Sequence, residues 1–219
     1  MFGRALALLR TNLSIVVPGC AVALVLALVQ TALEPADPLD DDLLHRSLRA
    51  IAQVLATIVS IAYTTGMADV AWQRGRATFA DGARAFRRDG GHVFVAMLVL
   101  FALGFLAAVL AAFSFGLSLL VYAFFCIYTM ASAVAGERPG LRAVAESAEI
   151  AFGRPLPTLG VVLGIGAVAF AMGFLATLLA NTPFVGPLLA DVVVQIVVAY
   201  AALVIVGEYR LLRGIGVPV

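Results

Sequence analysis

Long runs of apolar residues alternate along the chain with short stretches that carry nearly all of the charged side chains. The hydrocarbon core of a bilayer is about 30 Å thick and an α-helix rises about 1.5 Å per residue, so about 20 apolar residues make one crossing. The apolar runs 15–33 and 50–72 have this length. Each of them is predicted to be a transmembrane helix.

Two further apolar stretches are too long for one crossing and predict two helices each. The stretch 93–136 carries no charged residue and is interrupted by the turn sequence Ser114-Phe115-Gly116. The stretch 155–207 carries one charged residue and is interrupted by Asn181-Thr182-Pro183, which favours the end of a helix. The predicted spans are therefore 93–113, 117–136, 157–180 and 184–207.

The apolar runs predict an all-α membrane protein with six transmembrane helices in one domain, 1–219. Open strands leave backbone groups unpaired in lipid, and the runs lack the alternation of a barrel. A short amphipathic stretch with Arg precedes each pair of runs, at 3–12, 83–90 and 141–154. Such stretches lie as helices in the membrane interface. The pattern predicts three tandem helical hairpins, each preceded by a short interfacial helix.

Composition agrees with a chain that is solvated mainly by lipid. Apolar residues make up 63%, charged residues 12%, and the mean hydropathy is +1.07, outside the range of soluble domains. The net charge is +1 and the basic residues are scattered, which gives no basis for binding nucleic acid. The expected partners are membrane lipids, and a protein partner or a second copy of the chain stays open.

The distribution of Arg predicts the orientation. All fourteen basic residues are Arg, and all except Arg46 and Arg49 fall on one side of the predicted membrane. Basic residues accumulate on the cytoplasmic side. The chain is therefore expected in the cell membrane as a multi-pass protein with cytoplasmic N- and C-termini.

Two of the stretches between helices carry a family resemblance. They are Gly75-Arg76-Ala77-Thr78-Phe79-Ala80-Asp81-Gly82 and Gly136-Glu137-Arg138-Pro139-Gly140-Leu141. With the layout just described, the chain resembles a broad group of uncharacterised prokaryotic six-helix integral membrane proteins related to the membrane domain of glycerophosphodiester phosphodiesterases. The resemblance covers nearly the whole chain and implies the six-helix fold. It implies no phosphodiesterase activity, because catalysis in those enzymes belongs to a separate soluble domain.

Asp191 is the ionisable residue deepest in a predicted span, about 10 Å along the sixth helix. A carboxylate in lipid is costly, so it is expected to face the interior, to be protonated or to be paired. Gln195 shares its helix face, and Gln53 lies at a comparable depth on the second helix, with Arg49 just above it. These residues predict a polar cavity in the outer half of the bundle. Alternatively, Asp191 caps the start of its helix, where the helix dipole favours an anion.

Other polar residues allow further interpretations. Arg87, Arg88 and Arg154 lie beside amphipathic stretches and are candidates for contacts with anionic lipid headgroups. Asp69 is expected to pair with Arg74 or Arg76, and Trp72 to belong to the interfacial aromatic belt. The fifth predicted helix carries a small-residue face on which another helix can approach closely. Its residues are Gly160, Gly164, Gly166 and Gly173.

No cofactor or metal site is expected. His45 and His92 fall on opposite faces of the predicted membrane, and the acidic residues between 37 and 42 lack the Gly and the closing Glu of a calcium loop. The leading functional interpretation is a non-enzymatic accessory or lipid-interacting membrane component. The alternatives are a transporter-like bundle with a polar cavity around Asp191 and, from another class, a lipid-modifying membrane enzyme, which would need paired acid and base groups.

Overall fold

The computed structural model describes residues 1–32, 43–180 and 186–215, and within these residues every regular element is helical. The Asn181-Thr182-Pro183 break and the acidic residues of the first loop lie outside the described residues. The elements are α1 (Phe2–Thr11), η1 (Leu13–Ile15), α2 (Val17–Ala32), α3 (Leu43–Arg74), α4 (Phe79–Ser114), α5 (Leu117–Cys126), α6 (Thr129–Val134), α7 (Gly140–Gly153), α8 (Pro155–Ala180) and α9 (Gly186–Arg213).

The described helices confirm the predicted all-helical class, and most of them are long enough to cross a bilayer. Five stretches have both the length and the apolarity, namely Leu44–Arg74, Phe79–Ser114, Leu117–Val134, Pro155–Ala180 and Leu189–Arg213. A sixth would come from Phe2–Thr11 and Leu13–Val29 taken together, although these two helices are bent by 90° relative to each other. The described part of the chain therefore holds five or six candidate spans.

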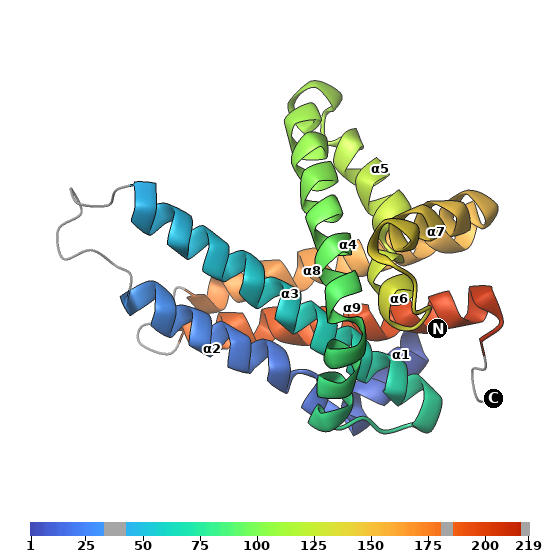
Figure 1. Ribbon diagram of the computed structural model, residues 1–219, viewed down its shortest axis with the longest axis horizontal. Coiled ribbons are helices and arrows are strands. Elements are labelled where there is room, and N and C mark those ends of the chain that lie inside the picture. The colour runs from blue at the N-terminus through green and yellow to red at the C-terminus, as the bar shows by residue number, and fades with distance from the viewer. Residues whose placement is uncertain (33–42, 181–185, 216–219) are drawn as a thin grey trace.

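The helices do not form one parallel bundle. α2, α3, α8 and α9 extend in a similar direction, whereas the α4–α5 hairpin stands across them (Figure 1). α3 packs against both α4 and α9, and α8 packs along α9. The α4–α5 hairpin therefore contacts the other long helices through α3 and projects away from them.

Short helices are present at two of the three positions where interfacial helices are predicted. α1 ends at Asn12 and α7 ends at Arg154, where the backbone leaves the helical region. The prediction of a separate short helix at 83–90 is wrong, because α4 runs unbroken from Phe79 to Ser114. A capping box of Thr78 and Asp81 starts this helix, and a single Gly in a helix costs only about 1 kcal/mol, which packing can offset.

The predicted turn at 114–116 is confirmed, whereas the fourth span is less regular than predicted. Phe115 and Gly116 both have positive φ, 50° and 83°, and they reverse the chain between α4 and α5. The predicted span 117–136 is divided into α5 and α6 at Ile127 and Tyr128. The two pieces still count as one apolar stretch of spanning length, Leu117–Val134.

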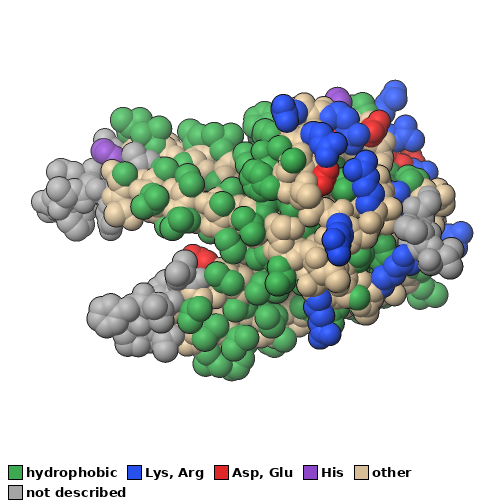
Figure 2. Space-filling model, turned by 90° about the horizontal axis from the view of Figure 1, so that it is seen from below, with side chains coloured by type: hydrophobic (Ala, Val, Ile, Leu, Met, Phe, Trp, Pro, Cys, Tyr) green, Lys and Arg blue, Asp and Glu red, His purple; other side chains and the backbone are tan. Residues whose placement is uncertain are grey.

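Arg side chains gather at one end of the molecule in the view of Figure 2, and at the opposite end two arms extend with a hollow between them. We call the former the arginine-rich end; there α3 ends at Arg74, α4 begins at Phe79 and α9 ends at Arg213. The main core of buried residues joins α1, α3, α6 and α9 and includes Trp72, Tyr128, Leu203 and Tyr209.

Of the glycines predicted to allow close helix approach, only Gly164 meets another helix within 4 Å in the described structure. A Cβ atom on Gly160, Gly166 or Gly173 would meet nothing within 4 Å, and one on Gly164 would meet the ring of Phe2. By contrast, a Cβ on Gly207 of α9 would lie 2.4 Å from Trp72 Cζ2 of α3. A Cβ on Gly164 would lie equally close, 2.4 Å from Phe2 Cζ, so tight contacts occur both at this position of α8 and in the core at the arginine-rich end.

Candidate functional site

A polar cavity of about 410 Å³ lies between α2, α3 and α9, on the side of the hollow seen in Figure 2. We call it the Asp191 cavity. Three of the residues singled out from the sequence, Asp191, Gln195 and Gln53, line it together. Its other lining residues are Gly19, Val22, Ala23, Leu26 and Ala27 of α2, Ala56, Thr57, Ser60 and Ile61 of α3, and Val198 of α9.

Helical periodicity brings the polar side chains of this cavity to one face of each helix. Gln53, Thr57 and Ser60 follow one another at intervals of four and three residues on α3, and Asp191 and Gln195 are four apart on α9. A Cβ atom on Gly19 would lie 2.0 Å from the Gln195 amide oxygen. Any larger residue at position 19 would displace the Gln195 side chain, so this close contact between α2 and α9 requires glycine.

Asp191 is the one carboxylate among the described residues that line this cavity, and none of these residues is basic. Its side chain is exposed and makes no hydrogen bond or ion pair with any other described residue. No acidic residue lies in the first turn of α9, so the structure does not support the alternative in which Asp191 caps this helix. Arg49 is not among the described residues that line the cavity.

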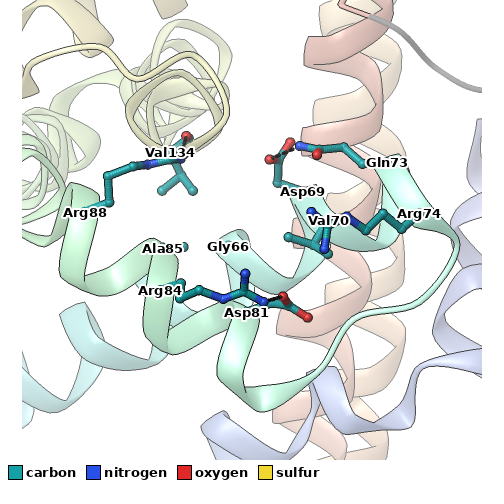
Figure 3. Close-up of a pocket in the computed structure, with 10 residues that line it drawn as sticks. All are labelled: Gly66, Asp69, Val70, Gln73, Arg74, Asp81, Arg84, Ala85, Arg88 and Val134. Carbon is teal, nitrogen blue, oxygen red and sulfur yellow. Dashed lines mark hydrogen bonds and ion pairs between the residues drawn. The ribbon is translucent and has the colours of Figure 1, made fainter.

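A second polar cavity, of about 310 Å³, lies at the arginine-rich end between α3, α4 and α6 (Figure 3). We call it the arginine cavity. Its charged lining residues are Arg74, Arg84 and Arg88 together with Asp69 and Asp81. The remaining lining residues are Gly66, Val70, Gln73, Ala85 and Val134.

Asp69 of the arginine cavity forms an ion pair with a residue of α9 that the sequence did not suggest. Its Oδ1 lies 2.5 Å from Nη1 of Arg210 on α9, and its Oδ2 accepts a 2.6 Å hydrogen bond from Gln73. Both partners of the ion pair are buried. The expected pairing of Asp69 with Arg74 or Arg76 is therefore wrong, because the fold brings the end of α9 against α3.

Trp72 is also placed differently from the expectation. It is 2% exposed, and its Nε1 donates a 2.7 Å hydrogen bond to the backbone carbonyl of Leu203. The Arg4 guanidinium lies 5.2 Å from the centre of its ring. Trp72 is thus a core residue between α3 and α9 and not part of an aromatic belt at the surface.

The three predicted headgroup arginines have different surroundings. Arg88 lies 2.9 Å from both Asp89 and Glu137, and it also donates to the backbone carbonyl of Val134. Arg87 and Arg154 are exposed, and no hydrogen bond or ion pair links either side chain to another described residue. Of the three, only Arg88 is a lining residue of the arginine cavity.

A buried carboxylate on α7 was missed by the sequence analysis. Glu146 is hydrogen-bonded by Ser132 of α6 and paired with Arg213 of α9, and Arg138 Nε lies 3.4 Å away. The sequence does carry a signal: Glu146 falls between Ala143 and Ile150 on the apolar face of the amphipathic stretch. A lone acid on such a face predicts a buried partner.

The described residues hold no group of three or more His, Cys, Asp or Glu side chains able to hold a metal ion. Comparison of the chain with protein-family models, with curated proteins and with solved structures finds no match. The resemblance to the membrane domain of glycerophosphodiester phosphodiesterases therefore stays a prediction.

Proposed function

We propose that the chain is a multi-pass integral membrane protein with the arginine-rich end at the cytoplasmic face. Five or six helices of spanning length support this, because such apolar surfaces are stable only in lipid. The separation in Figure 2 between the arginine-rich end and the two arms agrees with the accumulation of basic residues on the cytoplasmic side. Both termini then lie in the cytoplasm.

We further propose that the Asp191 cavity is a binding site for a small organic cation, as in a transporter-like bundle. The observation that carries this proposal is the lone Asp191 carboxylate in a cavity whose described lining residues include no basic one. A carboxylate without a protein partner in surroundings of low polarity attracts a cation. A volume of about 410 Å³ is within the range of small-molecule pockets.

The other lining residues define the kind of cation. Gln53, Gln195 and Ser60 supply neutral donors and acceptors, whereas Val22, Leu26 and Ile61 supply apolar surface. A few polar groups in an apolar wall orient a ligand that is itself partly apolar. The geometry therefore favours alkylated ammonium or guanidinium compounds over a hydrated metal ion. The proposed activity is binding and translocation rather than catalysis.

The proposal is tested by the binding of radiolabelled guanidinium, methylammonium and tetraethylammonium to the purified protein in lipid nanodiscs. We expect saturable binding of at least one of the three cations. In Asp191→Asn its dissociation constant should rise at least tenfold, because an amide cannot neutralise the ligand charge. A tenfold change corresponds to about 1.4 kcal/mol.

Glu149→Gln is the matched control. It removes one negative charge from an exposed position on α7 that does not line the Asp191 cavity. Binding that is lost in Asp191→Asn and kept in Glu149→Gln supports the site. Failure of all three cations to bind, or equal affinities in the two variants, would overturn it.

A further inference from the structure

The arginine cavity lies where α3 ends and α4 begins, and two guanidinium groups approach it from opposite sides. Figure 3 shows the side chains of Arg74, at the end of α3, and Arg84, on the second turn of α4, pointing toward one another. Both line the cavity of about 310 Å³, and both are exposed. The Asp81 carboxylate lies beside Arg84 on the side toward Arg74, and the cavity next to these three groups is open to a ligand.

The carboxylates of this cavity already have partners. Asp69 is paired with Arg210 and accepts from Gln73. Oδ2 of Asp81 accepts hydrogen bonds from the Thr78 backbone N–H at 2.8 Å and from the Thr78 hydroxyl at 2.7 Å. Asp81 also pairs with Arg84 and interacts electrostatically with Arg74, so this single carboxylate serves two guanidinium groups and leaves a net positive charge between them.

The arginines differ in how far they are paired within the protein. Arg88 is held by Asp89 and Glu137. Arg84 contacts Asp81 Oδ1 through Nη2 and donates from Nε to the Ala80 backbone carbonyl at 3.4 Å, and its side chain is 64% exposed. Arg74 makes no hydrogen bond or ion pair with another described residue. Arg74 and the Nη1 group of Arg84 therefore retain N–H donors beside the cavity.

We propose that the arginine cavity binds a phosphate group, held between Arg74 and Arg84. Planar guanidinium groups bind phosphate oxygens through paired charge-assisted hydrogen bonds, which are shorter and stronger than neutral ones. The phosphate can belong to a lipid headgroup or to a free phosphate ion. The cavity volume leaves room for the rest of a headgroup beside the phosphate.

The start of α4 supports an interfacial position for this site. Phe79, its first residue, is 53% exposed, while Asp81 in the same turn and Arg84 on the next one line the cavity. Apolar and charged faces on one helix are typical of a segment at the lipid boundary. If the arginine-rich end is cytoplasmic, as proposed above, it meets the leaflet that carries anionic lipids.

The experiment uses the protein in nanodiscs of phosphatidylcholine, titrated calorimetrically in two arms. One arm adds dihexanoyl phosphatidylglycerol and the other adds inorganic phosphate. We expect saturable binding in at least one arm, with a dissociation constant at least tenfold higher in the double variant Arg74→Gln/Arg84→Gln. Arg74→Gln alone should weaken binding at least threefold, and since Arg74 is exposed and makes no hydrogen bond or short ion pair with another described residue, this variant should fold normally.

Arg87→Gln is the matched control, because Arg87 is exposed on the same helix but does not line the cavity. Its dissociation constant should stay within twofold of the parent. Binding of phosphatidylglycerol alone identifies a lipid headgroup site, and binding of inorganic phosphate identifies a site for the free ion; either supports the proposal. Absence of binding in both arms, or equal weakening in Arg87→Gln and Arg74→Gln, would overturn it. The cation experiment at Asp191 is unaffected by either result.

Discussion

Trp72 Nε1 donates a 2.7 Å hydrogen bond to the backbone carbonyl of Leu203, and this bond joins α3 to α9 in the core at the arginine-rich end. The Asp69–Arg210 pair links the same two helices. Beyond these contacts, both helices line the Asp191 cavity. Packing at one end of the helix pair thus leaves the other end open for a ligand.

Gly207→Ala should destabilise the protein, because the added Cβ would lie 2.4 Å from Trp72 Cζ2. Overpacking of this kind costs about 1–3 kcal/mol. Gly173→Ala is the control, since its Cβ meets nothing within 4 Å and Ala is the better helix former by about 1 kcal/mol. Thermal unfolding in detergent, followed by Trp72 fluorescence, should show a lower midpoint for the first variant and an equal or higher one for the second. Equal decreases would contradict the tight contact.

Asp69→Asn should be among the most destabilising polar substitutions in the chain. It removes the Asp69 carboxylate from Arg210, which is 6% exposed, and breaking a buried pair costs about 3–5 kcal/mol. Glu149→Gln removes an exposed charge and should change the unfolding free energy by less than about 0.5 kcal/mol. Denaturant unfolding of the two variants in mixed micelles measures the difference. A loss in Asp69→Asn no larger than that of the control would show that the pair contributes nothing.

Asn12→Ala should loosen the attachment of α1 to the connection between α3 and α4. Asn12 Nδ2 donates to the backbone carbonyl of Gly75 at 3.0 Å, and its Oδ1 accepts from the Ala77 backbone N–H at 2.8 Å. The variant leaves a buried N–H unsatisfied, at a cost of about 1–3 kcal/mol. Faster hydrogen exchange at Ala77 would be the direct signal. Thr31→Val, which removes only an exposed bond to Ala27, should leave that exchange unchanged.

Glu146→Gln should weaken the junction of α7 with α6 and α9. The buried carboxylate interacts with Ser132, Arg138 and Arg213, and hydrogen bonds to charged groups contribute about 1.5–3 kcal/mol each. A double-mutant cycle with Arg213→Met should give a coupling energy above about 0.5 kcal/mol. Additive effects of the two substitutions would mean that the contact does not stabilise the fold.

The proposed orientation predicts opposite labelling at His45 and Arg154. In a Cys20→Ser/Cys126→Ser background, His45→Cys should react with a membrane-impermeant maleimide added outside intact cells. Arg154→Cys should react only after the membrane is permeabilised. The reverse pattern would invert the orientation, and labelling of both positions in intact cells would contradict the proposed topology.

The apolar runs by themselves determined the helical class and most of the helix positions, because apolarity over about 20 residues is a local property of the chain. The turn at Phe115 and Gly116 and the short helices α1 and α7 were also predictable from local sequence. The continuity of α4 was not. Gly90 and Gly91 permit a break, and only the packing of α4 along α3, where Gly66 faces Ala85, decides that the helix continues.

For the polar residues, the sequence determined which were costly to bury but not which of them meet. Asp191, Gln195 and Gln53 could be grouped by depth alone, since depth follows from position along a helix. The partners of Asp69 and Glu146 could not be predicted in this way. Arg210 and Arg213 belong to a helix distant in sequence, and only the tertiary fold brings them to these carboxylates. The convergence of Arg74 and Arg84 depends likewise on the angle at which α4 leaves α3. Such an angle is set by interhelical packing, which no local pattern encodes.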